Sequence, residues 1–210
     1  MTRFYDFVRQ DYGDVYADAL MCGTYEQLPR CANCQLAGRR RIPPLIIEWD
    51  DGSNVIGDFT WPAGLEEIVV SDRVKTCFQS NGLVGIEFEP VEMFQKPNLK
   101  KPTKESRAKR RVWLPYNGPP LWSLVVTSSF HLDLVKSKRS VVNECQRCGR
   151  ERMIVHDRAA PLVLTGDLSQ RADLFRIREM GKLVFGVESV RQIIEENRFT
   201  NVQMKERGRL

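Results

Sequence analysis

The sequence predicts an α+β fold in which a mixed or antiparallel sheet carries a few short helices. Short apolar runs bounded by Gly, Pro, Asn or Asp outnumber the helical patterns along the chain. The same order of patterns also occurs twice, with offsets of 114 to 116 residues. A chain of 210 residues, 42% of them hydrophobic, suits one compact domain or two small ones, and we expect a single domain, residues 1–210.

In the first half, about residues 1–94, the run from Leu45 to Trp49 predicts a strand, and the Asp-Gly step at Asp51 and Gly52 after it is a strong hairpin signal. A helix over 72–81 begins at Ser71 or Asp72, where a capping side chain is available, and ends at Gly82. Its apolar residues follow the i, i+3, i+4 spacing of a one-sided helix. The further elements expected here are a helix at 15–20 and strands at 68–70 and 86–89.

The second half, about residues 112–210, contains the corresponding patterns. Runs at 112–114 and 121–126 flank a Pro-Tyr-Asn-Gly-Pro-Pro turn and are typical of strands. An apolar run at 183–185 predicts another strand, and a helix follows it that begins at Glu188 or Ser189 and ends at Asn197. Apolar and polar residues then alternate over 202–205, as expected for a half-buried strand.

Six cysteines occur, and four of them form two Cys-x-x-Cys pairs. Such a turn lets both thiolates converge on one ion, and two turns complete the four-sulfur shell of tetrahedral Zn²⁺ at about 2.3 Å per bond. Gly149 after the second pair suits a tight turn, because glycine tolerates positive φ. The sequence therefore predicts a structural Zn²⁺ site whose ligands are Cys31, Cys34, Cys145 and Cys148.

Other uses of the cysteines remain open. One pair could cycle between dithiol and disulfide, but that role would leave the other pair without a purpose. Permanent disulfides are disfavoured in a cytosolic protein. Cys22 has no counterpart in the second half and is not expected to be a fifth ligand, and Cys77 aligns with Ile193 and is expected to be a small buried core residue.

The 114 residues between the two pairs exceed the spacing of an ordinary zinc ribbon. In each half the pair is followed by a strand, a short helix and a strand. The halves are therefore predicted to be similar units joined by one shared zinc site. Because strand-helix-strand units are common, both duplication of one unit and chance similarity remain explanations.

Residues 95–111 form a basic connector between the halves. The connector has eight basic residues and one acidic residue, which gives it a charge of +7 and leaves −2 for the rest of a chain of net charge +5. Pro97, Pro102 and the self-repulsion favour an exposed or mobile linker. The connector could also contact nucleic-acid phosphates, although no aromatic residue interleaves it as a base-stacking platform would require. Its basic residues are Lys96, Lys100, Lys101, Lys104, Arg107, Lys109, Arg110 and Arg111.

The sequence lacks the common catalytic motifs. Gly-x-Ser-x-Gly, phosphate-loop, Gly-x-Gly-x-x-Gly and His-Glu-x-x-His patterns are all absent. His131 and the second cysteine pair bear a loose likeness to zinc deaminases, but Asp133 stands where their glutamate does, and the proline before the cysteine is missing. We therefore expect no enzyme, and we expect His131 and His156 to be surface or satisfied core groups.

Two features bear on location. The longest nearly uninterrupted apolar stretch, 121–130, falls well short of the roughly 20 residues that span a bilayer. The N-terminus acquires Asp6 and Arg9 before an apolar region can develop, so it is not expected to act as a secretory signal. The expectation is a cytoplasmic protein with no membrane partner.

Five segments carry a family resemblance. They are Arg3-Phe4-Tyr5, Leu28-Pro29, Gly57-Asp58-Phe59-Thr60-Trp61, Cys145-Gln146-Arg147-Cys148-Gly149 and Asp173-Leu174-Phe175-Arg176-Ile177-Arg178. On these segments, and over nearly its full length, the chain resembles the double-CxxCG motif immunity proteins, a paralogous family first noted in myxobacteria. Gln35 departs from the pattern, because it stands where glycine normally follows the first pair.

The resemblance implies protection rather than catalysis. Members are similar to the immunity partner of a polymorphic lipoprotein toxin exchanged between kin cells, which neutralises the toxin in the recipient cytoplasm. The implied partner is a cognate toxin effector domain, bound over a total buried area of typically about 1,600 Å². The alternative function is a zinc-stabilised nucleic-acid-binding protein that uses the basic 96–111 segment.

Overall fold

The computed structural model describes residues 3–10, 15–23, 25–62, 67–101, 110–149, 151–165, 172–181 and 183–209. Strand predominates over helix in these residues, which contain two short α-helices, α1 (Asp72–Ser80) and α2 (Glu188–Glu196), and a short 3-10 helix, η2 (Arg178–Met180). The strands form sheets with both parallel and antiparallel neighbours. The predicted fold class, a mixed sheet with a few short helices, is confirmed.

The strands follow one another in two series of eight. The first series is β1 (Arg3–Val8), β2 (Ala19–Met21), β3 (Tyr25–Arg30), β4 (Ala37–Arg41), β5 (Leu45–Trp49), β6 (Phe59–Thr60), β7 (Val69–Ser71) and β8 (Ile86–Met93). The second series is β9 (Leu121–Val126), β10 (Ser129–Leu132), β11 (Arg139–Glu144), β12 (Glu151–Val155), β13 (Leu162–Thr165), β14 (Leu174–Ile177), β15 (Val184–Val187) and β16 (Gln203–Arg209). Helix α1 precedes the last strand of the first series, and α2 precedes the last strand of the second.

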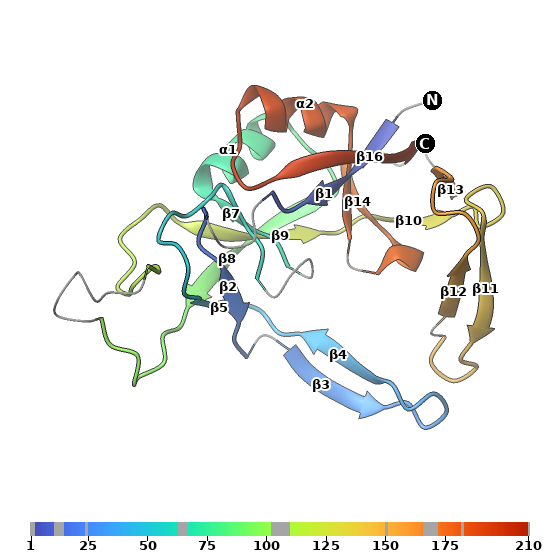
Figure 1. Ribbon diagram of the computed structural model, residues 1–210, viewed down its shortest axis with the longest axis horizontal. Coiled ribbons are helices and arrows are strands. Elements are labelled where there is room, and N and C mark those ends of the chain that lie inside the picture. Colours follow the sequence, from blue (N-terminus) through green and yellow to red (C-terminus); the bar gives the residue numbers. More distant parts are fainter. Residues whose placement is uncertain are drawn as a thin grey trace.

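The strands form two larger sheets and two ribbons (Figure 1). Strands β1, β15, β14, β10, β13 and β16 close into a barrel, and β2, β5, β8, β9, β7 and β6 form an open six-stranded sheet. Each ribbon is a two-stranded hairpin, β3–β4 or β11–β12. Both ribbons extend away from the two helices, which lie together at the opposite side of the molecule.

The two larger sheets repeat each other strand by strand. Strand β5 pairs antiparallel with β2 and parallel with β8, and β13 pairs in the same senses with β10 and β16. The order β2-β5-β8-β9-β7-β6 in the open sheet thus corresponds, strand for strand, to the order β10-β13-β16-β1-β15-β14 in the barrel. The barrel differs by one pairing, because β14 also joins β10 in parallel and closes the sheet.

The first strand of each series is exchanged between the halves. Strand β1 lies antiparallel between β15 and β16 of the second half, and β9 lies antiparallel between β7 and β8 of the first. The register repeats as well, since Tyr5 is opposite Gly186 as Trp122 is opposite Val70. Each sheet is therefore completed by a strand from the other half.

Two aspartates add reciprocal contacts between the halves. Asp58, just before β6, accepts hydrogen bonds from the backbone N and the hydroxyl of Thr200, at 3.0 and 3.1 Å, in the loop between α2 and β16. Asp173, just before β14, accepts a hydrogen bond of 2.9 Å from the backbone N of Val84, in the loop between α1 and β8. In each case, an aspartate of one half therefore accepts a hydrogen bond from the loop after the helix of the other half.

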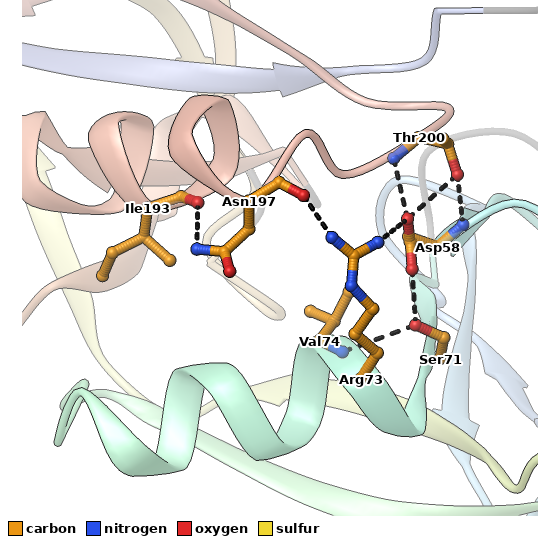
Figure 2. A network of polar contacts seen from close by, with 7 residues as sticks. All are labelled: Asp58, Ser71, Arg73, Val74, Ile193, Asn197 and Thr200. Carbon is orange, nitrogen blue, oxygen red and sulfur yellow. Dashed lines mark hydrogen bonds and ion pairs between the residues drawn. The ribbon is translucent and has the colours of Figure 1, made fainter.

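Asp58 also organises the start of α1 (Figure 2). Its carboxylate accepts a hydrogen bond of 2.9 Å from Ser71 Oγ and lies 3.1 Å from the guanidinium of Arg73. The Arg73 guanidinium reaches on to the backbone carbonyl of Asn197 at the end of α2. One carboxylate thus links the beginning of one helix to the end of the other.

The main hydrophobic core is built from both halves. Val74 and Phe78 of α1 pack in one cluster with Val190 and Ile194 of α2, and all four are buried. A second cluster fills the barrel, where the ring of Phe175 packs edge-on against those of other buried phenylalanines. Because the large cluster takes side chains from both sheets, the two halves bury their apolar surface together.

Both predicted helices form close to the expected bounds. Ser71 caps α1, since its hydroxyl accepts a hydrogen bond of 3.4 Å from the backbone N of Val74. The two helices end alike, with the side chain of Asn81 or Asn197 donating 2.9 Å hydrogen bonds to the carbonyl four residues earlier. Side-chain caps thus mark the start of α1 and the ends of both helices. The cap expected at Glu188 or Ser189 does not form, because α2 begins after Val187 with no side-chain cap.

Two predictions in the first half are wrong. No helix forms at 15–20, where Ala17 and Ala19 are buried in alternation and residues 19–21 become strand β2. The turn at Asp51 and Gly52 makes no hairpin, because strand β5 pairs with the distant β2 and β8 instead. The turn packs on the end of the connector, with the N of Gly52 donating a 2.8 Å hydrogen bond to the carbonyl of Arg110.

None of the helices in the described ranges combines the length and the apolar character that crossing a membrane requires.

Candidate metal centre

The two ribbons carry the cysteine pairs at their tips. Cys31 and Cys34 lie in the turn between β3 and β4, and Cys145 and Cys148 lie in the turn between β11 and β12. In each turn the backbone N of the residue after the pair donates a 2.8 Å hydrogen bond to the carbonyl of the first cysteine. The same local geometry therefore presents each pair of thiols.

The four thiols predicted as ligands lie together. All four sulfur atoms are within 4.8 Å of one another, although the two pairs are 114 residues apart in the chain. Across the ribbons, the Sγ–Sγ distance is 3.7 Å for Cys31 and Cys145 and also 3.7 Å for Cys34 and Cys148. None of the four is in a disulfide.

This arrangement fits a tetrahedral metal ion. Metal–sulfur bonds of about 2.3 Å in a tetrahedron place the sulfur atoms about 3.8 Å apart, close to the two distances across the ribbons. The group contains only thiols, which suit Zn²⁺ better than the hard cations that prefer oxygen. The four cysteines could therefore hold one ion between the ribbons.

The turns also favour the thiolate forms that a metal requires. Backbone N–H groups of Cys148 and Arg147 point toward Cys145 and lower the pKa of its thiol to about 6. Those of Cys34 and Asn33 likewise lower the pKa of Cys31. In each turn, backbone N–H groups therefore favour the thiolate form of the first cysteine.

Asn33 adds a contact that the sequence did not predict. Its side-chain Nδ2 lies 3.6 Å from Cys145 Sγ, so an amide of the first turn donates toward a thiol of the second. Hydrogen bonds of this kind orient metal ligands and reduce the charge on sulfur. The position of Asn33 between Cys31 and Cys34 indicated that its side chain lies near the thiols. The sequence alone does not reveal that it faces Cys145 of the other pair.

The other two cysteines lie outside the group. Cys22 Sγ is 3.9 Å from a carboxylate oxygen of Glu48, and burial raises the pKa of this thiol. Cys77 is partly buried and packs against the shared core, close to its predicted role. Neither of them is among the ligand atoms that cluster in the described residues.

Both histidines have other partners. His131 Nδ1 is 2.8 Å from the carboxylate of Glu179, and His156 Nε2 is 2.7 Å from Ser140 Oγ. Among the residues that the structure describes, no histidine joins the four thiols. In zinc deaminases a histidine binds the metal together with cysteines. His131 does not take that place here, because it lies outside the group of four thiols.

The basic connector is only partly exposed. Lys100, Lys101 and Arg110 are exposed, as predicted, whereas residues 102–109, which include Lys104, Arg107 and Lys109, lie outside the described residues. The prediction of exposure is wrong for Arg111, which is 6% exposed, donates to the carbonyl of Trp49 and lies 3.2 Å from the carboxylate of Asp51.

Lys96, at the N-terminal end of the connector, forms an ion pair. Its ammonium is 3.1 Å from the carboxylate of Glu48, which is itself buried. Both ends of the connector are therefore anchored to β5 and the turn after it.

No protein-family model matches this chain, and no curated protein matches it significantly.

Proposed function

We propose that this chain is a cytoplasmic, zinc-stabilised immunity protein that binds and neutralises a cognate polymorphic toxin. The observation that carries the proposal is the group of four thiols, two from each half of the chain. It agrees with the paired-cysteine pattern of the double-CxxCG immunity proteins, which the sequence resembles.

The proposed Zn²⁺ would be held by the four cysteines and would act as a structural crosslink. A two-stranded ribbon is only marginally stable by itself, so each of the two ribbons needs a further interaction that holds its strands in place. Structural zinc sites supply apparent binding energies of roughly 10 to 16 kcal/mol, enough to fix two ribbons against each other.

A fixed surface suits a protein that acts by binding. Ordering of mobile segments on association reduces affinity, so an interface that is rigid in advance binds more tightly. Ribbons held by the metal would meet this need. We propose accordingly that the chain acts without catalysis and that its partner is a toxin effector domain.

Genetics tests this proposal directly. The gene should adjoin a toxin gene, and its deletion should be tolerated only when that toxin is also absent. Complementation by the wild-type chain should restore growth, whereas Cys31→Ser/Cys145→Ser should fail. Cys22→Ser/Cys77→Ser is the matched control and should protect. Normal growth of the deletion strain with the toxin intact would refute the proposal.

Nucleic-acid binding is the second candidate, favoured by the exposed Lys100, Lys101 and Arg110. Binding of DNA or RNA that weakens with added salt, and that is lost when these three residues are changed to Gln, would support it. Arg111 is left out of the test because its substitution would disturb its buried contacts. Absence of salt-sensitive binding by the wild-type chain would exclude this function.

A further inference from the structure

A second feature of the molecule lies away from the cysteines. Where β13 runs beside the end of β16, a groove of about 630 Å³ opens next to these two strands. We call it the arginine groove. Its apolar surface comes from residues 159–163 and Met180, and its charged residues are Arg139, Arg158, Arg207, Arg209 and Glu206.

Most of the positive charge in the arginine groove is not neutralised. Arg207 donates to the buried carboxylate of Asp6 at 2.7 Å, and Glu206 is 3.4 Å from Arg3. In the part of the chain that the structure describes, no ion pair involves any of the other three arginines, Arg139, Arg158 and Arg209. Three of the arginines that line the groove thus have no carboxylate partner among the described residues.

Arg139 is the clearest sign of an absent partner. Its Nε is shielded from solvent and has no hydrogen-bond partner among the described residues, and its Nη1 contacts only the sulfur of Met180, at 3.3 Å. Burial and the nearby charge of Arg207 both lower the pKa of Arg139. A shielded N–H without an acceptor is costly even in a half-buried side chain, and proteins keep such groups chiefly at functional sites.

We propose that the arginine groove binds a small phosphate-bearing molecule. Guanidinium groups match phosphate oxygens in pairs, which gives hydrogen bonds assisted by charge. A single carboxylate would leave two of the three positive charges unmatched, whereas a phosphate monoester or a diphosphate carries about two or three negative charges. The proposal goes beyond toxin binding and does not depend on it.

The shape of the groove supports a small ligand. Its volume lies within the roughly 300 to 1,000 Å³ of typical small-molecule sites, and its apolar floor would accept the uncharged part of the ligand. None of the described residues that line it is aromatic, so these residues offer no platform for stacking the bases of a single strand. These features favour a small molecule over a nucleic acid.

Calorimetric titration of the full-length protein with pyrophosphate and with phenyl phosphate tests the proposal. We expect saturable binding of one ligand per chain. Phenyl phosphate should also bind more tightly than inorganic phosphate, titrated for comparison, because its ring can contact the apolar residues of the groove. Arg158→Gln/Arg209→Gln should weaken pyrophosphate binding about tenfold or more, as expected for lost charge-assisted hydrogen bonds. Lys100→Gln/Lys101→Gln removes the same charge outside the groove and should leave the affinity within about twofold.

Arg139→Met separates binding from folding. It should abolish pyrophosphate binding while the thermal unfolding midpoint stays equal or rises, because a shielded N–H without an acceptor is removed. Failure of pyrophosphate to saturate the wild-type protein, or an equal loss in the lysine control, would overturn the proposal. So would tighter binding of an RNA oligomer that pyrophosphate cannot displace.

Discussion

Gln35 and Gly149 occupy equivalent places, each directly after a cysteine pair, and both have a left-handed backbone with φ of 58° and 65°. Glycine takes this conformation freely, whereas a residue with a Cβ pays about 1 kcal/mol or more. In Gln35 the side chain compensates in part, since Nε2 donates a 3.0 Å hydrogen bond to the carbonyl of Ala32. The departure from the glycine pattern therefore leaves the shape of the turn unchanged.

This comparison predicts an asymmetry between the two turns. Gly149→Ala should lower the free energy of unfolding by about 1 kcal/mol through backbone strain alone, because nothing lies within 4 Å of the added Cβ. Gln35→Gly should not destabilise the protein. Gly149→Asn is the control, because asparagine tolerates positive φ, and it should cost less than alanine in chemical denaturation. Equal losses for alanine and asparagine would contradict this explanation.

Asp58 provides a second prediction at the scale of the residue. Asp58→Ala removes the acceptor for Thr200, Ser71 and Arg73, and leaves the part-buried donors of Thr200 and Ser71 without this acceptor. We expect a loss of about 2 to 4 kcal/mol in the free energy of unfolding, measured by chemical denaturation. Asp157→Ala, which removes one exposed 2.8 Å contact to the N of Ala159, should cost much less. Similar costs for the two variants would argue against a linking role for Asp58.

Between elements, each exchanged strand is fastened to a helix in the same way. Tyr5 of β1 donates to the carboxylate of Glu188 in the first turn of α2, and Arg191 lies over its ring. On the other side, the indole N–H of Trp122 in β9 donates to Asp72 of α1 at 2.8 Å, with Lys75 over its ring. An aromatic ring between a carboxylate and a cation thus anchors each strand.

The anchor on β1 predicts a pH dependence. Arg191 and then Tyr5 lower the pKa of Glu188 below its ordinary 4.5. A lowered carboxyl pKa stabilises the folded state above the unfolded pKa, and that stability is lost as pH falls through the folded pKa. Glu188→Gln should therefore be less stable than wild type at pH 6, and the difference should vanish in acid.

Denaturation curves from pH 7 to below 4 measure this effect. Glu196→Gln, at the end of the same helix, should show no such convergence with the wild type. A gap between Glu188→Gln and wild type that stays constant down to the lowest pH would contradict the ion-pair explanation.

The sequence predicted those elements whose signals are local. Apolar periodicity gave both helices, a capping serine gave the start of α1, and the cysteine spacing gave the two turns whose thiols could hold a metal. The helix expected at 15–20 failed because burial there alternates, as in a strand. The hairpin expected after β5 failed because strand partners depend on distant segments, which turn residues do not specify.

At the scale of the whole molecule, the halves interlock. Strands β1 and β9 each complete the other half's sheet, the cysteine ribbons meet, and one core receives side chains from both helices. Reciprocal contacts of Asp58 and Asp173 follow the same relation. These correspondences favour duplication of one unit over chance similarity. Sequence offsets hinted at the repeat, but they could not show that the first strands are exchanged.

The exchange of β1 and β9 predicts that the two halves stay associated when the connector between them is cut. A protease site inserted within 102–109 should yield two fragments that still elute together under native conditions. Chelation of metal should not separate them, because each fragment keeps a strand in the other's sheet. Denaturant should release both fragments. Spontaneous separation after cleavage, with the wild-type chain intact under the same protease treatment, would contradict the exchange of β1 and β9.

The central claim is that one Zn²⁺ joins the two ribbons through four thiolates. Zinc analysis and X-ray absorption on protein purified under reducing conditions test it most directly. We predict one zinc per chain with four sulfur ligands at about 2.3 Å, and loss of the metal in both Cys34→Ser and Cys148→Ser but not in Cys22→Ser. Wild-type protein that contains no zinc, or zinc with nitrogen or oxygen ligands, would contradict the claim.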